Sequence, residues 1–229
     1  HAVRNQGRKH LGERQTVVLE GARCRLHDRN IATPFLPGKR FDFAYRLRDA
    51  CRLEHHPAET EMPIKVGDTL PDGKLSESTE YDAQAGCPIN PQTLSVAEAS
   101  KGKKLVIFAL PGAYTPTCSA KHVPSYVKNY DALKAKRVDE IWCVAKNDAF
   151  VMAAWGRDQK ATGKIRMLGD GNADWTRKLG LEIDRTSANM GLRSQRYSML
   201  VENGVVKKLN VEAPGKYEVS GAEVMLGQL

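Results

Sequence analysis

Apolar and polar positions along the second part of the chain follow a pattern that predicts strands and helices in turn. Three short apolar runs are typical of buried strands, and they occupy residues 104–110, 139–146 and 165–168. After the first run, apolar residues recur three or four positions apart, which predicts a helix from Cys118 to about Lys136. After the second run, Asn147 or Asp148 can cap a helix whose apolar face comprises Phe150, Val151, Ala154 and Trp155.

Shorter elements are predicted on both sides of these runs. Upstream, we expect a partly extended lead-in and a short helix after a loop, at residues 67–75 and 90–100. Downstream, short helices are expected at about 174–179 and 220–228, with strands at 193–201 and 205–211 between them. The dipeptide Asn203-Gly204 joins the two strands and is a strong hairpin signal. This order of elements predicts an α/β, thioredoxin-like fold with a mixed sheet and helices on both faces.

Residues 1–61 differ from the rest of the chain, because they contain no methionine and no serine and show no sustained period. We interpret them as an N-terminal extension, mostly disordered or outside the natural domain. Residues 62–229 form the predicted domain, which begins at Met62. A mitochondrial presequence would be rich in serine and poor in acids, so the extension fits that interpretation badly.

The formal net charge of +8 is spread evenly over the two parts of the chain. Neither part has a basic stripe with interleaved aromatic residues, so we expect no nucleic-acid partner. No apolar run approaches the roughly 20 residues that a membrane span needs, so we expect no membrane partner.

The chain has five cysteines, namely Cys24, Cys51, Cys87, Cys118 and Cys143. They form no Cys-x-x-Cys pair and no zinc-finger spacing, so we predict neither a disulfide framework nor a metal site. An odd number of cysteines without a signal peptide favours free thiols in a reducing compartment, and we expect a cytoplasmic protein.

The residues around Cys118 suggest that its thiol is reactive. The segment Pro111-Gly112-Ala113-Tyr114-Thr115-Pro116-Thr117-Cys118-Ser119 breaks a buried strand and leads into a helix. Cys118 therefore lies in the first helical turn, where unpaired N–H groups and the helix dipole favour an anionic thiolate. The alternative is a buried structural cysteine, which the polar, proline-bracketed loop disfavours.

A lone thiolate suits attack on a weak bond such as the O–O bond of a peroxide. A hydrolase would need an oriented base, and nothing in the sequence orients His122 for that role. Thr115 can point its hydroxyl into the concavity of the thiol, while Pro111 and Pro116 shield the sulfur. Strand alternation sends Arg193 and Arg196 to opposite faces, and one of them must supply a positive charge. Arginine at either position satisfies this requirement.

The loop closely resembles the active-site loop of peroxiredoxins of the type II/type V subfamily. Three further blocks are similar to signatures of that family, namely 122–126, 147–157 and 191–199. The resemblance covers Met62 to Leu229 and leaves the extension unmatched.

The resemblance implies a thiol peroxidase, with no cofactor, that reduces hydrogen peroxide and alkyl hydroperoxides. Cys118 matches the peroxidatic cysteine, Thr115 the peroxide-binding hydroxyl and Arg196, rather than Arg193, the arginine that favours the thiolate. Further residues match the substrate-binding part of the site, namely Pro111 as the shielding proline and the backbone N–H groups of Thr117 and Cys118. His122 lies one turn after Cys118, and we expect a packing or hydrogen-bonding residue there or a wall of the substrate pocket. Pro124 is expected to kink the helix after Cys118.

Some members of the subfamily have a second, resolving cysteine near the C-terminus, and the matching region 217–221 has none. The resemblance therefore implies a one-cysteine enzyme reduced by glutathione with glutaredoxin, or by thioredoxin. Cys143 is expected in the core, and Cys87 is expected to be exposed. A homodimer formed through loops near Thr117 and Trp175 is the family-level expectation. Alternative functions are a thioredoxin-fold chaperone or interaction module and a thiol–disulfide oxidoreductase, and the lack of Cys-x-x-Cys disfavours the latter.

Overall fold

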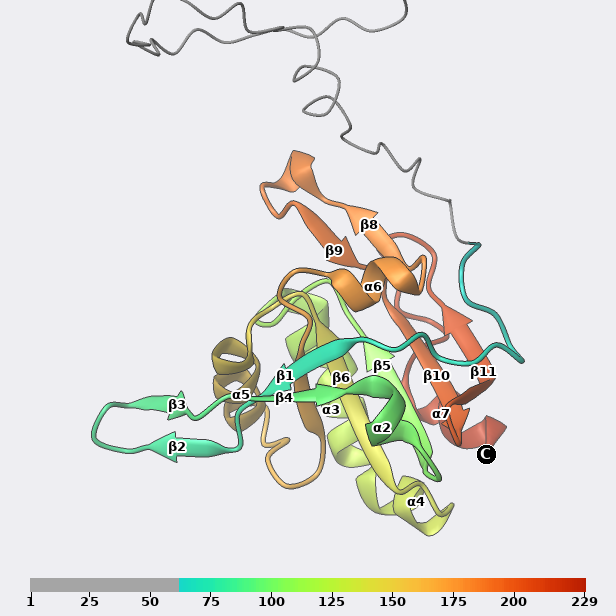
Figure 1. Cartoon of the computed structure of the whole chain (residues 1–229), viewed down its shortest axis with the longest axis horizontal. Helices are drawn as coiled ribbons and strands as arrows, with labels where there is room; N and C mark the ends of the chain where they lie inside the picture. The colour runs from blue at the N-terminus through green and yellow to red at the C-terminus, as the bar shows by residue number, and fades with distance from the viewer. Residues whose placement is uncertain (1–61) are drawn as a thin grey trace, which may run out of the picture. The chain divides into compact units, whose positions relative to one another are not determined.

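The computed structural model describes residues 62–229, so the predicted extension, with Cys24 and Cys51, lies outside the described residues. A seven-stranded mixed sheet runs in the order β11-β10-β5-β6-β7-β1-β4 (Figure 1). Its strands are β1 (Lys74–Glu77), β4 (Gln92–Ser95), β5 (Lys104–Ala109), β6 (Glu140–Ala145), β7 (Arg166–Gly169), β10 (Tyr197–Glu202) and β11 (Val205–Val211). The central strands β5, β6 and β7 are parallel, and the flanking pairs are antiparallel.

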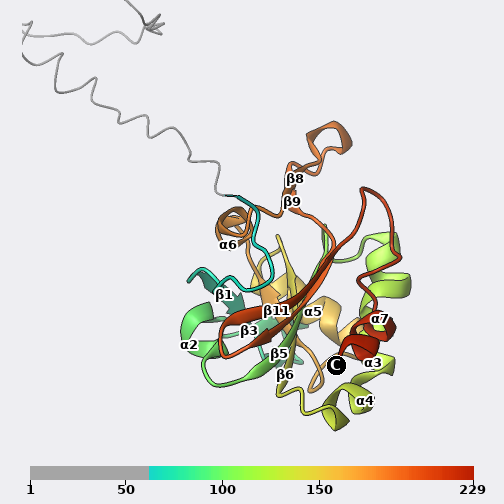
Figure 2. The same ribbon diagram turned by 90° about the vertical axis from the view of Figure 1, so that its right-hand side faces the viewer.

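Helices cover both faces of this sheet (Figure 2). One face packs against α3 (Val123–Lys128), α4 (Tyr130–Ala135), α5 (Ala149–Asp158) and α7 (Ala222–Gln228). The other packs against α2 (Val96–Ser100) and α6 (Asp174–Lys178). The predicted α/β, thioredoxin-like architecture with helices on both faces is confirmed.

Strand β5 shows how the sequence divides the core. Leu105, Ile107 and Ala109 belong to the cluster on the α2/α6 face. The alternate residues, Val106, Phe108 and Leu110, belong to the cluster on the opposite face. All six are fully buried, which explains why the run is apolar without alternation. Burying each large side chain contributes about 1.5–3 kcal/mol, so β5 anchors the loop that follows it.

The predicted single strand at 193–201 is wrong. The chain forms β9 (Leu192–Ser194), paired with β8 (Glu182–Asp184) in a separate ribbon, and re-enters the main sheet only at β10. Gln195 and Arg196 lie between the two strands, where Gln195 N–H donates to Leu181 O (2.7 Å). The strict alternation assumed for this segment therefore does not hold.

Two other predictions need correction, and one element was not predicted. Residues 90–100 contain β4 before α2, because β4 pairs with β1. A hairpin of β2 (Glu80–Asp82) and β3 (Cys87–Ile89) extends from the domain and was not predicted (Figure 1). In α5 the buried residues are Ala149, Met152, Trp155 and Gly156, whereas Phe150 is exposed. This helix is apolar around most of its circumference, so spacing alone could not select the buried face.

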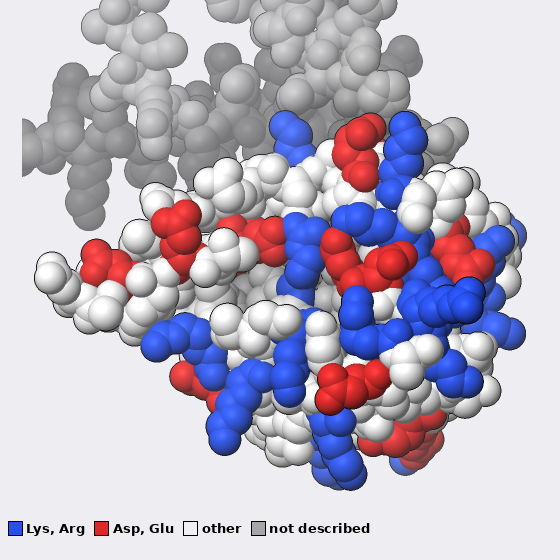
Figure 3. All heavy atoms as spheres, turned by 90° about the horizontal axis from the view of Figure 1, so that it is seen from below, with Lys and Arg blue, Asp and Glu red and all other residues white. Residues whose placement is uncertain are grey.

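Basic and acidic side chains are interspersed on the face of the domain that Figure 3 shows. Among residues 62–229, none of the helices combines the length and apolar character needed to cross a membrane. In the same residues, no three His, Cys, Asp or Glu side chains are grouped so as to hold a metal ion.

Candidate active site

Cys118 begins a π-helical turn, Cys118–His122, in which the Val123 N–H donates to Cys118 O. Pro124 follows directly and has no N–H to donate to the preceding turn, so a wider turn is accommodated there. The predicted continuous helix to Lys136 is wrong, because α3 ends before Asn129 and α4 begins after it. The side-chain amide of Asn129 donates to Ser125 O (2.9 Å) and competes with the backbone hydrogen bonds of the helix.

Hydrogen bonds fix the loop that precedes Cys118. The Ala113 N–H donates to Asn147 Oδ1 (2.9 Å), and the Thr115 hydroxyl donates to Gly112 O (2.9 Å). Ser119 N–H donates to Thr115 O (3.0 Å) and is the first N–H of this helical segment with a backbone acceptor. The N–H groups of Thr117 and Cys118 are therefore among the unpaired donors at a helix start.

Arg196 connects the sulfur to the helix beside it. Its Nη1 lies 3.4 Å from Cys118 Sγ and 3.1 Å from His122 Nδ1. His122 Nε2 lies 3.1 Å from Ser220 O, a carbonyl that can only accept, so Nε2 carries the proton. Nδ1 then accepts from Arg196 and holds the guanidinium beside the sulfur.

His122 is fully buried and bonded at both ring nitrogens, as expected for a packing or hydrogen-bonding residue, and it forms no exposed wall of a pocket. Burial, followed by the positive charge of Arg196, lowers the pKa of His122 to about 3. The imidazole is therefore neutral at pH 7 and keeps an acceptor for Arg196. A protonated ring would place two cations in contact.

We expect His122 to make folding depend on pH. Its pKa is lowered on folding, so the unfolded chain binds a proton below about pH 6.5 that the folded chain does not bind. The free energy of unfolding should therefore fall by about 1.4 kcal/mol per pH unit between about pH 6 and 4 on account of His122. His122→Phe should remove this component. The measurement is urea unfolding of both proteins across that range.

The difference between the wild type and His122→Phe isolates this imidazole, because His122 is the only histidine among residues 62–229. The carboxylates contribute equally to the pH dependence of the free energy of unfolding in both proteins, so their contribution cancels in the difference. Parallel pH curves for the two proteins would contradict a neutral, buried imidazole.

A buried carboxylate orders the segment that supplies the carbonyl of Ser220. Glu212 Oε1 accepts from the N–H groups of Glu218, Val219 and Ser220 and from the Ser220 hydroxyl, each at 2.8 Å. Burial raises the pKa of Glu212, but these hydrogen bonds outweigh it and leave the pKa below its ordinary value. The Tyr126 hydroxyl also donates to Ser220 O (2.9 Å), so this carbonyl is fixed from two sides.

Cys118 has no exposed area, so its sulfur is shielded from solvent. The Tyr217 ring packs near two side chains of the site, with its centroid 5.2 Å from that of His122 and 6.0 Å from Arg196 Cζ. Burial alone would also suit a structural cysteine, but a guanidinium against the sulfur is a feature of reactive rather than structural cysteines.

Both arginines contact the loop, which corrects the expectation that Arg193 faces away. Arg193 Nη1 donates to Pro111 O (3.3 Å), and its Nε donates to Met190 O (2.8 Å). The break in the strand between them lets both side chains point to the same loop. Sequence reasoning also missed Glu212 and the role of Asn147 in holding Ala113. Asn147 lies in a family-like block, which was a usable signal, whereas nothing local marked Glu212.

The other described cysteines lie where the sequence placed them. Cys87 is exposed in the β2–β3 hairpin, and Cys143 is fully buried in β6. Burial, followed by the proximity of Cys118, raises the pKa of Cys143 well above its ordinary value. Cys143 is thus a core thiol that stays protonated.

The chain matches the Redoxin family over residues 65–226. It is 42% identical to peroxiredoxin-2C of Arabidopsis thaliana over 167 residues, covering 73% of this chain and 99% of that protein. It is 46% identical to the chloroplastic peroxiredoxin-2E-2 of Oryza sativa subsp. japonica over 170 residues, covering 72% of each. The structure of reduced Prx3 from Vibrio vulnificus in complex with H2O2 is 51% identical, with a TM-score of 0.65, and covers 72% of this chain and 98% of that one.

A cysteine at a helix start on a thioredoxin-like fold, with an arginine against its sulfur, defines a redox-active thiol protein. Together with the matches above, it defines a thiol-dependent peroxidase. The chain belongs to the peroxiredoxin family.

Proposed function

We propose that Cys118 is the peroxidatic cysteine of this peroxidase and that Arg196 stabilises its thiolate. The observation that carries this assignment is the 3.4 Å separation of Arg196 Nη1 and Cys118 Sγ. A guanidinium at that distance favours the anionic form of the thiol and faces the oxygen on which charge develops. The Vibrio vulnificus relative was solved with H2O2 bound, which supports a peroxide as the substrate here.

In the proposed reaction, the thiolate attacks the terminal oxygen of hydrogen peroxide or an alkyl hydroperoxide. The S–O bond forms as the O–O bond breaks, so the sulfur loses two electrons and the peroxide gains them. Cys118 becomes a sulfenic acid, and the leaving oxygen takes up a proton to give water or an alcohol. The roles proposed for the loop are to shield the sulfur, by Pro111, to bind the peroxide, by the Thr115 hydroxyl, and to stabilise the developing charge, by the N–H groups of Thr117 and Cys118.

We further propose that an external thiol reduces the sulfenic acid, in a one-cysteine cycle. Cys143 is buried in the middle of β6, and the segment 217–221 has no cysteine. Glutathione with glutaredoxin is the donor we favour, and thioredoxin is the second candidate. The test is to oxidise the protein with one equivalent of peroxide and measure recovery of the free Cys118 thiol with each donor system. An intramolecular disulfide found by mass spectrometry before any thiol is added would contradict a one-cysteine cycle.

We propose that the protein forms a homodimer through the loop before Cys118 and the start of α5. The family-level expectation places the contact in loops near Thr117 and Trp175, and the Trp175 side chain itself is fully buried. Tyr114 and Phe150 are large and exposed, at 55% and 45% of their surface. The bond from Ala113 N–H to Asn147 Oδ1 joins their two segments beside the site, and the Tyr114 hydroxyl donates to Asp158 Oδ2 (2.8 Å) at the far end of α5.

Replacing both Tyr114 and Phe150 by aspartate should shift the protein from dimer to monomer, because an interface cannot bury unpaired carboxylates without a large cost. Light scattering after size exclusion should give twice the 25.4 kDa chain mass for the wild type and that mass for the variant. Val66→Asp, at another exposed apolar residue, is the control and should remain dimeric. A wild-type protein of single chain mass would refute the proposed dimer.

The free thiols of Cys87, Cys118 and Cys143 suit a reducing compartment, and we propose a cytoplasmic location.

A further inference from the structure

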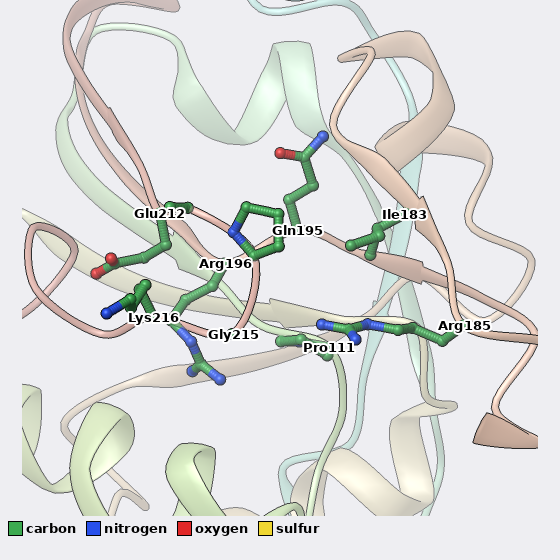
Figure 4. Close-up of a pocket in the computed structure, with 10 residues that line it drawn as sticks. Pro111, Ile183, Arg185, Gln195, Arg196, Glu212, Gly215 and Lys216 are labelled. Carbon is green, nitrogen blue, oxygen red and sulfur yellow. The ribbon is translucent and has the colours of Figure 1, made fainter. Parts of the chain in front are cut away.

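A small pocket, of about 40 Å³, adjoins the site (Figure 4). Pro111 and Arg196 contribute to it from the site itself. Ile183 and Arg185 come from the β8 ribbon and its end, and the loop 213–216 supplies the remaining wall. Because Arg196 lines the pocket and also contacts Cys118 Sγ, its side chain links the pocket to the sulfur.

The lining of this pocket is cationic. Arg185, Arg196 and Lys216 are the three positive side chains, and Glu212 is the single carboxylate. One oxygen of Glu212 already accepts four hydrogen bonds from residues 218–220. Lys216 makes only an exposed ion pair with Glu218 (3.4 Å), which water and salt weaken.

Arg185 is the cation of this pocket whose charge is not balanced by a carboxylate of the described residues. Among residues 62–229, no carboxylate lies within salt-bridge distance of its guanidinium, and that group donates no hydrogen bond to a described acceptor. Its side chain extends toward Pro111 in Figure 4. A guanidinium with its donors available in this way is suited to bind a carboxylate with two parallel hydrogen bonds.

From these observations we infer that the pocket receives a small thiol bearing carboxylates, and that Arg185, assisted by Lys216, binds those carboxylates. The inference rests on the proposed function, because it names the site at which the external reductant meets oxidised Cys118. The pocket is larger than one water molecule but smaller than a tripeptide, so it accommodates one end of such a thiol. The rest of the reductant lies over the exposed loop 213–216.

The chemistry at this site proceeds in two balanced steps. The thiolate of the reductant attacks the sulfur of the Cys118 sulfenic acid, and the S–O bond breaks as the S–S bond of a mixed disulfide forms. The hydroxyl leaves as water after taking up a proton. A second reductant thiolate then attacks the sulfur of the first reductant molecule, which releases the Cys118 thiolate and the disulfide of the reductant. The two reductant thiols together lose two electrons, and the Cys118 sulfur gains them.

The test compares two reductants that share one thiol and differ in charge. Cys118 is first oxidised by one equivalent of hydrogen peroxide, and its reduction is then followed by stopped flow with glutathione or with glutathione diethyl ester. In the wild type, glutathione should reduce Cys118 faster than its diethyl ester does, and added salt should reduce the difference between the two rate constants. In Arg185→Glu, the rate constant with glutathione should fall by about tenfold or more, while that with the ester should change less than about twofold.

Two further variants make the result specific. Lys101→Glu changes the charge equally at an exposed residue outside the pocket, and it should not alter the preference for glutathione. Arg185→Gln removes the charge without reversing it, and it should reduce the preference while keeping the native circular dichroism. Equal rates with both thiols in the wild type, or equal slowing of both in the Arg185 variants, would overturn the inference. Absence of any Cys118 sulfenic acid in the wild type would instead overturn the proposed function.

Discussion

Replacing Cys118 by serine should abolish peroxide consumption, with a fall of at least about 1000-fold in the rate. A serine hydroxyl is close to the thiol in size but is not ionised at neutral pH, so the nucleophile is lost while the packing is retained. Cys118 is fully buried in the cluster that contains Phe108 and Tyr126, and its replacement by serine should cost only a modest part of the free energy of unfolding. The measurement is the decrease of hydrogen peroxide in the presence of a saturating thiol donor.

Matched cysteine variants isolate the effect. Cys87→Ser changes an exposed thiol in the β2–β3 hairpin and should retain the wild-type rate. Cys143→Ser changes a core thiol and should affect stability more than turnover, because Cys143 is protonated and buried. Peroxide turnover that survives in Cys118→Ser and disappears in either of the other variants would place the reactive sulfur elsewhere.

Arg196→Gln should lower the rate of sulfenic acid formation at pH 7 by roughly 100- to 1000-fold. The guanidinium is the cation against the sulfur, and its loss removes both the charge that favours the thiolate and a donor to the reacting oxygen. Glutamine can still donate to His122 Nδ1, so the ring keeps a partner. The rate should recover in part at alkaline pH, where hydroxide ionises the thiol without help from the arginine.

Arg193→Gln is the matched control for this prediction. Arg193 contacts Pro111 O rather than the sulfur, so its loss should loosen the loop and slow the reaction by a smaller factor. Its rate should not recover specifically at alkaline pH, since thiol ionisation is not what it supplies. Stopped-flow measurement of both variants from pH 6 to 10 tests this difference. Identical pH profiles for the two arginine variants would reject the role assigned to Arg196.

Much of the fold followed from local pattern. The runs that became β5, β6 and β7 are apolar because both of their faces are buried, and Asn203-Gly204 forms the predicted hairpin between β10 and β11. Asp148 caps α5 by accepting from the Val151 N–H (2.9 Å), as the sequence allowed. These features depend on residues close together in the chain, which is why they could be predicted.

The features that were missed depend on distant residues. The separation of β9 from β10 and the wide turn at Cys118 have weak local signals, and α5 selects its buried face only through tertiary packing. His122 could be placed one turn after Cys118, but its bonds to Arg196 and Ser220 join residues 74 and 98 positions apart. The contacts of Tyr217 with His122 and Arg196 likewise come from a loop that no local pattern connects to the site.

The most direct test of the central claim is the mass of the intact protein after treatment with one equivalent of hydrogen peroxide. The account predicts the gain of a single oxygen atom, located on the peptide that contains Cys118 and removed by added thiol. An unmodified Cys118, with the oxygen found on another residue or with no gain in mass, would contradict it.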